Sequence, residues 1–332
     1  MNPHTKQIVH ESLDHKQTTQ ISSVSVIIPC FNSGRYLLDS VSSALNQNGD
    51  FSFLEVIVID DRSDDTDTLS ALADISKMAG VSVLHNHGPK GSAAARNVGI
   101  RNAKGEWIAF LDADDWWPLD SLANRFSVLE KYPNASWIGG DFIELNRDGT
   151  TEKSGRFERN IETYSFLKDA YSKKAPILLD SPLHHFLKQA PTHTIVTLVK
   201  RKLLEEIEGF DERQLRQQDY HLFLRLSAIT SFVFVPRIVA NYRHHESNST
   251  KSLTHTQEWR IKALDDLAQR PEFASVKNIL NQRIAQLHLS NSYEYRNENN
   301  FQAAALSALR CLNKGGYGIL AIKSLIAALL NK

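Results

Sequence analysis

The stretch WIAFLDADDWW, from Trp107 to Trp117, places an apolar run directly before three carboxylates within four positions. A run that is continuously apolar, rather than alternating, is typical of a strand buried on both faces of a parallel sheet. Three other short apolar runs also end in polar or acidic residues: SVIIP (25–29), LEVIVIDD (54–61) and VSVLHN (81–86). Segments with helical spacing separate the runs, at 36–47, 65–80 and 91–105. This alternation predicts an α/β fold with a mostly parallel sheet flanked by helices.

The polar residues that follow these four runs are predicted to share one edge of the sheet. Parallel strands present their carboxyl ends together, and ligands bind in the crevice outside those ends. The residues concerned are Asn32, Asp60, Asp61, His85, Asn86 and Asp112–Asp115. Each one alone is compatible with a solvated loop, but their common location favours a binding site.

The acidic cluster needs something to offset its own repulsion. Two unit charges roughly 4 Å apart repel by about 4 kcal/mol at an effective dielectric constant of 20. If the strand continues through the cluster, Asp112 and Asp114 point to the same side and converge on one divalent cation. Carboxylate oxygens suit Mg²⁺ or Mn²⁺, which keep positions open for phosphate oxygens. The alternative is a helix cap, with Pro118 as the first helical residue.

Composition limits the function classes. The 332 residues are 42% hydrophobic and 23% charged, which suits a globular protein with a sizeable core. The formal net charge of zero argues against a broad nucleic-acid-binding surface. Cys30 and Cys311 are far apart and provide no disulfide framework or zinc spacing, which favours a reducing, cytoplasmic location. The sequence has no apolar run of about 18 residues, the length that a spanning helix needs.

The pattern also indicates where segments begin and end. Residues 1–22 are polar and predict a flexible tail, and the α/β domain is predicted over 23–250. Between residues 147 and 191 the pattern loosens into a long loop with helical turns, which is usual for functional or mobile segments. Residues 251–332 predict a C-terminal helical region, including a helical hairpin over 291–315.

Five stretches occur in one order along the chain: VSVIIPCFNSGRYL (24–37), EVIVIDDRSDDT (55–66), GSAAARNVGI (91–100), GEWIAFLDADDWW (105–117) and GFDERQLRQQDYHLFLRL (209–226). Their order and spacing resemble the family 2 inverting glycosyltransferases. The resemblance covers about two-thirds of the chain. It implies a GT-A fold with a nucleotide-sugar half (23–117) and an acceptor half (118–250), and a DxD motif that binds Mn²⁺ or Mg²⁺.

The resemblance also implies roles for residues of the nucleotide-sugar half. It places in the nucleotide site Pro29, Phe31, Asn32, Asp61, Arg96, Asp112 and Ala113. Asp61 would accept a hydrogen bond from the base, Asp114 would bind the metal, and Asp60 and Asp115 would support the turns. Two alternatives stay open at this point: Phe31 as an ordinary core residue, and Arg96 as a structural ion pair with the acidic cluster.

In the acceptor half, the resemblance identifies Asp219 as the catalytic base. The family pattern has Glu-Asp where this chain has Gln218-Asp219, so the contacts of the missing glutamate are in doubt. The alternative for Asp219 is a helix cap. NYRHHESNST (241–250) resembles a Tyr-Arg-x-His stretch, in which His245 would complete the metal shell and Arg243 would offset phosphate charge, with His244 as a bystander.

The leading hypothesis is therefore a metal-dependent inverting glycosyltransferase of polysaccharide synthesis, with a UDP-sugar donor and a saccharide or lipid-linked acceptor. The alternatives are a nucleotidyltransferase, disfavoured because PCFNSGRYL lacks a glycine- and lysine-rich loop, and a non-catalytic sugar- or nucleotide-binding protein on the same fold. The apolar C-terminal stretch ILAIKSLIAALLNK predicts either burial against the catalytic domain or peripheral contact with the cytoplasmic face of a membrane.

Overall fold

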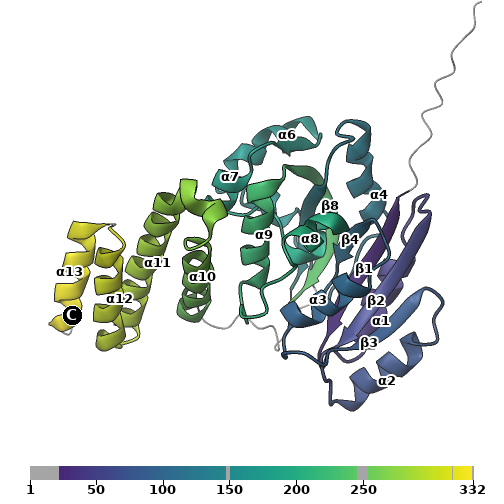
Figure 1. Cartoon of the computed structure of the whole chain (residues 1–332), viewed down its shortest axis with the longest axis horizontal. Helices are drawn as coiled ribbons and strands as arrows, with labels where there is room; N and C mark the ends of the chain where they lie inside the picture. Colours follow the sequence, from purple (N-terminus) through teal and green to yellow (C-terminus); the bar gives the residue numbers. More distant parts are fainter. Residues whose placement is uncertain (1–21, 147–149, 245–252, 316, 331–332) are drawn as a thin grey trace, which may run out of the picture.

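The computed structural model of the chain describes residues 22–146, 150–244, 253–315 and 317–330. A single sheet with its flanking helices forms one end of the molecule. Helices α10 to α13 form a row that extends away from the sheet to the C-terminus (Figure 1).

The sheet has eight strands in the order β3-β2-β1-β4-β7-β5-β8-β6. Strands β1, β2, β3 and β4 run parallel, and β5 runs parallel to β8. Strands β7 and β6 are antiparallel to their neighbours, so the sheet is mixed but mostly parallel. The strands are β1 (Ser23–Cys30), β2 (Phe53–Asp60), β3 (Val81–His85), β4 (Trp107–Phe110), β5 (Trp137–Leu145), β6 (Ile177–Leu179), β7 (Leu198–Lys200) and β8 (Phe232–Arg243).

The helices that flank the sheet are short, and those of the C-terminal row are longer. The first group is α1 (Tyr36–Leu45), α2 (Thr66–Ile75), α3 (Ser92–Asn102), α4 (Ser121–Phe126), α5 (Arg156–Arg159), α6 (Lys168–Lys173), α7 (Leu183–Lys188), α8 (Arg201–Glu206) and α9 (Gln218–Ile229). The second is α10 (Leu253–Leu267), α11 (Lys277–Asn297), α12 (Phe301–Asn313) and α13 (Gly318–Leu329).

Burial explains why the first four strands read as continuous apolar runs. In β1 and β4 nearly every side chain is buried, because helices cover both faces of the sheet. Helix α3 lies very close to the sheet at Gly99, where an added Cβ would lie 2.5 Å from a methyl of Ile27. This close approach brings the N-terminus of α3 to the edge where β1 and β2 end.

The structure confirms the four predicted strands, the three helices between them and the helical hairpin, here α11 and α12. The side chain of Asp65 caps α2 by accepting a hydrogen bond from the Thr68 amide. One local prediction and two of the alternatives are wrong. The chain turns at Asp112–Asp115 instead of continuing the strand, helix α4 begins at Ser121 and not at Pro118, and the N-cap of α9 is Gln217 and not Asp219.

The loosely patterned region contains more regular structure than its sequence indicates. Residues 177–179 form β6, which adds an edge strand next to β8, and the helices α5, α6 and α7 are each only four to six residues long. Such short elements carry little periodicity, so they are hard to recognise in the sequence. Within the described residues, no helix has the length and apolar character needed to cross a membrane.

Candidate active site

The site lies at the carboxyl edge of the parallel strands. In the order β3-β2-β1-β4, strands β2 and β3 lie on one side of β1 and β4 lies on the other. Ligands of open α/β sheets bind in the crevice at such a change of side, outside the carboxyl ends of the strands. The loops after β1, β2, β3 and β4 meet there, together with the N-termini of α3 and α9. Hydrogen bonds between side chains join these segments one to the next.

The loops after β1 and β2 are held together by Asn32. Its side-chain amide donates to the carboxylate of Asp64 at 2.7 Å, and its carbonyl oxygen accepts from the Asp64 amide at 3.0 Å. Asn32 adopts a left-handed backbone with φ of 48°, which asparagine tolerates better than most residues. Pro29 lies within β1 and pairs with Ile59 of β2.

Asp60 and Asp61 are buried and organise the edge. Asp60 accepts a hydrogen bond from the Ser63 amide at 3.0 Å. Asp61 accepts from the side chain of Asn86 at 2.6 Å and from the backbone of Gly91 at 2.7 Å. Each oxygen of Asp61 therefore already holds one bond, and each keeps a second lone pair for a further donor.

Phe31 is 44% exposed and is not a core residue. The ammonium of Lys90 lies 3.7 Å from the centroid of its ring. This contact joins the loop after β1 to the loop before α3. The exposed aromatic face next to a cation is suited to a base or another flat ring.

A buried ion pair clamps the acidic turn. The guanidinium of Arg96, only 4% exposed, donates to Asp112 at 2.6 Å. Two further guanidinium nitrogens of Arg96, Nε and Nη1, are buried and have no partner among the described residues. The predicted salt bridge therefore exists, and buried donors remain that could face an added anion.

The last carboxylate of the turn points inward. Asp115 is 1% exposed and accepts a hydrogen bond from the Arg243 amide at 2.8 Å. Burial, and then the charges of Asp114 and Asp112, raise the pKa of Asp115 well above its usual range. Asp114 is partly exposed, and Ala113 before it is buried. The repulsion within the cluster is therefore reduced in part by Arg96 and by the raised pKa of Asp115.

Arg243 reaches the same turn from the end of β8. Its guanidinium lies 4.3 Å from the ring of Tyr36 and 4.8 Å from the ring of Trp116, and it pairs with Asp39 at 3.1 Å. The two rings fix the orientation of the guanidinium plane. His244 contacts Glu144 at 3.3 Å, and His245 lies outside the described residues.

Asp219 and Gln218 lie in the first turn of α9. Gln218 donates from its amide to the hydroxyl of Ser92 at the start of α3, at 2.9 Å. Asp219 is partly exposed, and its Oδ1 accepts a hydrogen bond from the Tyr220 amide at 2.8 Å. The Gln218–Ser92 bond thus brings the start of α9 to the edge that carries the acidic turn.

Among the described residues, the one group whose potential ligand atoms lie close enough together to hold a metal ion is outside the Asp112–Asp115 turn. Asp211, His221 and Asp266 each offer a ligand atom, and these atoms lie within 4.8 Å of one another. However, Arg213 contacts Asp211 at 2.6 Å and Asp266 at 2.8 Å, and Arg270 contacts Asp266 at 2.8 Å. Burial and the charge of Arg225 lower the pKa of His221 to about 4.

The carboxylates of this group are already neutralised by two guanidiniums, which would repel a divalent cation. Burial raises the pKa of Asp211, but hydrogen bonds from Arg213 outweigh it and lower the pKa to about 2. The group is therefore best described as an ion network that joins α9 to α10.

Sequence reasoning missed several residues that shape this edge. Lys90, Ser92 and Tyr36 were not among the predicted site residues, and Asn86 was noted only for its position. Asn86 is 1% exposed and also donates to the carbonyl of Pro89, so it shapes the loop that carries Lys90. The sequence did indicate Asn86, because it ends the third apolar run, as Asp61 ends the second.

Comparison with known proteins agrees with this geometry. Residues 25–181 match the model of glycosyl transferase family 2. The glycosyltransferase GlyG of Streptococcus pneumoniae is 39% identical over 213 residues, which are 63% of this chain and 67% of GlyG. An uncharacterized glycosyltransferase of Rickettsia bellii is 29% identical over 73% of this chain, which spans only 33% of that protein.

Two further proteins cover most of the chain. The UDP-Glc:alpha-D-GlcNAc-diphosphoundecaprenol beta-1,3-glucosyltransferase WfgD of Escherichia coli is 26% identical over 82% of this chain and 97% of its own length. The crystal structure of S. aureus TarS residues 1–349 superposes with a TM-score of 0.62 at 15% identity, over 92% of this chain and 90% of that one. TarS has also been solved in complex with UDP-GlcNAc, with a TM-score of 0.62 at 16% identity over 87% of this chain and 81% of that one.

These likenesses confirm the predicted GT-A fold and account for the order of the five sequence stretches. The chain belongs to glycosyl transferase family 2.

Proposed function

We propose that this protein is an inverting, metal-dependent glycosyltransferase that moves a sugar from a UDP-sugar to a saccharide or lipid-linked acceptor. One observation carries the proposal: helix α3 holds both segments, because its Arg96 clamps the Asp112–Asp115 turn and its Ser92 accepts from Gln218 at the start of α9, which bears Asp219. This arrangement supports a donor site at the turn and a base from a distant part of the chain at the same edge.

The chemistry follows from this placement. The carboxylate of Asp219 accepts the proton of the acceptor hydroxyl while the hydroxyl oxygen bonds to the anomeric carbon. The bond from that carbon to the diphosphate oxygen breaks on the opposite face, and the nucleoside diphosphate carries away the electron pair. Attack opposite the leaving group inverts the anomeric configuration.

The donor is held by residues of the nucleotide-sugar half. The exposed ring of Phe31 lies against the uracil, and Asp61 accepts a hydrogen bond from it through a free lone pair. Arg96 orients Asp112 toward the ribose, and its unpartnered nitrogens donate to donor oxygens. Pro29 and Ala113 shape the pocket walls.

The residues present fit a divalent cation. Mg²⁺ is commonly bound by one or two carboxylates together with substrate phosphates, and the partly exposed Asp114 supplies such a carboxylate. Asp112 is paired with Arg96 and Asp115 is buried, so neither carboxylate competes with Asp114 for the cation. A bound Mn²⁺ or Mg²⁺ would supply charge neutralisation for the leaving diphosphate. Arg243 would add positive charge on the same side, and His245 is the second ligand by the family pattern.

The relatives support the substrate classes. TarS binds UDP-GlcNAc, and WfgD is named for transfer from UDP-glucose to a sugar on a diphosphate lipid. We expect this chain to use a donor and an acceptor of these classes. Incubation with a panel of UDP-sugars, Mn²⁺ and lipid-linked or free saccharides should yield a glycosylated product with inverted configuration by NMR. UDP binding without any transfer or hydrolysis would favour the non-catalytic alternative.

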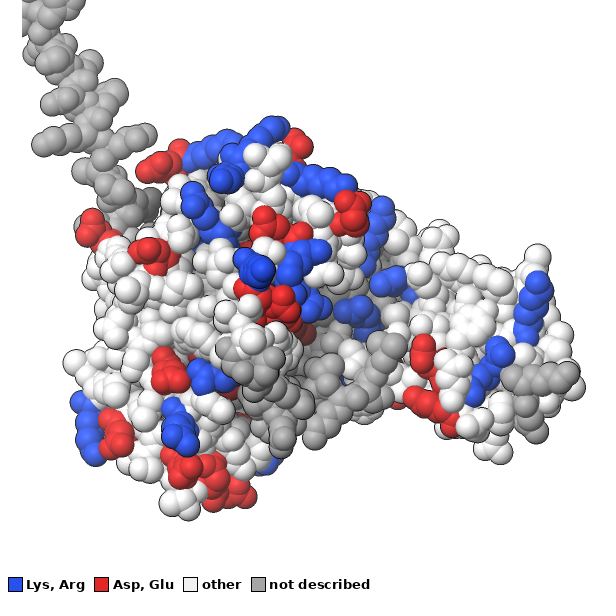
Figure 2. All heavy atoms as spheres, turned by 180° about the vertical axis from the view of Figure 1, so that it is seen from behind, with Lys and Arg blue, Asp and Glu red and all other residues white. Residues whose placement is uncertain are grey.

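We also propose that α13 contacts a membrane surface. Its apolar side chains are exposed, with Ile319 at 74% and Leu329 at 68%. Residues 299–332 contain four Lys or Arg and no Asp or Glu, which suits anionic lipids. Figure 2 shows this end of the molecule as mainly uncharged surface with isolated basic side chains.

A flotation assay tests the membrane contact. The full chain should float with phosphatidylglycerol vesicles, whereas the double variant Ile319→Glu/Leu329→Glu should remain in the unbound fraction. Leu69→Glu, which changes an exposed leucine on α2, is the matched control and should float like the wild type. Equal flotation of all three proteins, or none by the wild type, would contradict the proposal.

A further inference from the structure

A polar cleft lies within the C-terminal row of helices, outside the site described above. It has a volume of about 460 Å³ and is lined by α10, α11 and α12. None of the residues assigned to the donor or to catalysis lines it. Clefts of this size accommodate small ligands.

The cleft contains buried polar groups that the protein leaves without partners. Asn291 on α11 is 1% exposed, and its Oδ1 has no hydrogen-bond partner among the described residues. Ser307 on α12 and His288 on α11 are also buried. A buried amide oxygen without a partner costs roughly 1–3 kcal/mol, so Oδ1 of Asn291 calls for a hydrogen-bond donor in the cleft.

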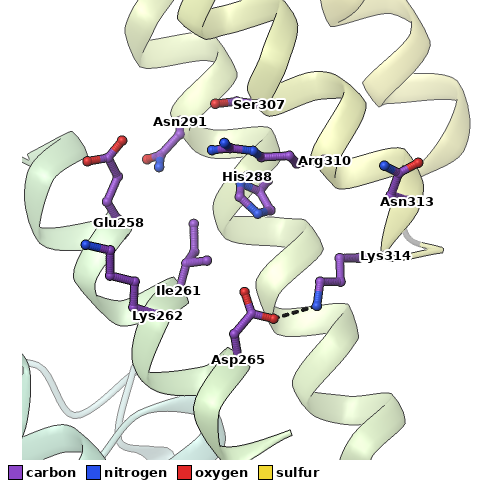
Figure 3. Close-up of a pocket in the computed structure, with 10 residues that line it drawn as sticks. All are labelled: Glu258, Ile261, Lys262, Asp265, His288, Asn291, Ser307, Arg310, Asn313 and Lys314. Atoms are coloured by element: carbon purple, nitrogen blue, oxygen red, sulfur yellow. Dashed lines mark hydrogen bonds and ion pairs between the residues drawn. The ribbon is translucent and has the colours of Figure 1, made fainter. Parts of the chain in front are cut away.

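A guanidinium lies next to this amide. Figure 3 shows Arg310 reaching from α12 toward Asn291, with Ser307 on one side and His288 on the other. The side chain of Arg310 is exposed, and its guanidinium forms no salt bridge with a carboxylate among the described residues. Burial and the nearby Arg310 lower the pKa of His288 to about 4, so the imidazole is neutral at pH 7.

The acidic residues of the cleft already have partners. Asp265 pairs with Lys314 at 2.5 Å at the far end of the cleft, and Glu258 accepts a hydrogen bond from the Tyr295 hydroxyl at 2.6 Å. Lys262 adds a further cation to the lining. The cleft therefore combines a guanidinium without an ion pair, the hydroxyl of Ser307, the unpartnered amide oxygen of Asn291 and two carboxylates that can still accept from hydroxyl groups.

We propose that this cleft binds a phosphorylated saccharide or polyol. The phosphate lies at Arg310 and Ser307, where a guanidinium and a hydroxyl donate to its oxygens, and a hydroxyl group of the ligand donates to the unpartnered Oδ1 of Asn291. The other hydroxyl groups of the ligand lie toward Glu258 and Asp265. A sugar or polyol therefore accounts both for the carboxylates in the lining and for a cleft larger than a phosphate. The same chemistry is present in soluble sugar phosphates and in hydroxylated phospholipid headgroups.

Calorimetric titration of glucose 1-phosphate, inorganic phosphate and glucose into the full chain at constant ionic strength tests this site. Glucose 1-phosphate should bind more tightly than phosphate, and glucose should show no binding. Saturating UDP and Mn²⁺ should leave the binding in place, because the cleft is separate from the donor site. No binding of glucose 1-phosphate, or its full displacement by UDP, would overturn the proposal.

Two variants locate the binding. Arg310→Gln should weaken it by roughly tenfold to a hundredfold, the usual range for loss of a charged hydrogen bond. Asn291→Asp, nearly isosteric, should abolish it by placing a carboxylate beside Arg310. Lys323→Gln removes an exposed cation of α13 outside the cleft and should leave the affinity unchanged. Wild-type affinity in both cleft variants, with wild-type melting temperatures, would place the ligand elsewhere and overturn the proposal.

Phosphatidylglycerol vesicles distinguish the two sources of the ligand. If a lipid headgroup is the source, vesicles should displace glucose 1-phosphate from the wild type. If a soluble sugar phosphate is the source, vesicles should leave its binding unchanged. Both outcomes support the phosphate site and assign its ligand.

Discussion

Replacing Asp219 by asparagine should lower kcat by roughly 10²–10⁴-fold, the usual contribution of a general base. Asparagine keeps the size of the side chain and its oxygen can still accept from the Tyr220 amide, so the start of α9 should remain in place. It cannot take a proton from the acceptor hydroxyl. Steady-state kinetics at saturating donor should show the loss, while calorimetry should show wild-type affinity for UDP.

The matched control is Asp74→Asn, which changes an exposed aspartate on α2 that pairs with Lys77. This variant should keep wild-type kcat and melting temperature. If Asp219→Asn keeps kcat within about tenfold of the wild type, the assignment of the base is wrong. A loss of both kcat and UDP affinity would instead point to a structural role for this carboxylate.

Replacing Asp114 by asparagine should remove the metal dependence of UDP binding. In the wild type, Mn²⁺ should strengthen UDP binding measured by calorimetry, because the cation joins a carboxylate to the diphosphate. In Asp114→Asn the affinity in Mn²⁺ should fall by at least roughly 10–100-fold, since even second-shell changes at metal sites cost that much. Without metal, the two proteins should bind UDP equally.

Asp120→Asn is the control for this experiment. Asp120 is exposed on the same loop and accepts a hydrogen bond from Asn48, which asparagine can still accept. This variant should keep the metal dependence. UDP binding that responds to neither Mn²⁺ nor the change at Asp114 would show a metal-free donor site and overturn the proposed role of Asp114.

The strands and helices of the first half could be predicted because their signals are local. Runs such as SVIIP and LEVIVIDD are buried on both faces, so most of their side chains are apolar, and the buried Ser25 donates a hydrogen bond to the buried Glu55. The polar residues at their ends then fall at one edge for geometric reasons alone. The same reasoning failed at Asp112–Asp115, where the chain turns, because periodicity within four residues does not separate a strand from a turn.

The partners of the site residues could not be predicted in the same way. Arg96 contacts Asp112 from another element, and Gln218 contacts Ser92 across 126 positions of the sequence. Arg243 lies between Tyr36 and Trp116, which come from two other segments. Nothing in the spacing of these residues indicates such pairs, because the pairs depend on how α3, α9 and β8 pack against the sheet.

The sequence by itself determined the α/β class, the family resemblance and the edge at which polar residues collect, since burial and chain direction impose these through short-range patterns. Only the tertiary structure decided how exposed each carboxylate is and which groups surround it. Asp112 is held by the buried Arg96, Asp115 is buried with a raised pKa, and Asp114 remains partly exposed. The physical reason is that the charge and accessibility of a carboxylate depend on groups brought near it from distant segments by packing, and packing is a property of the whole fold.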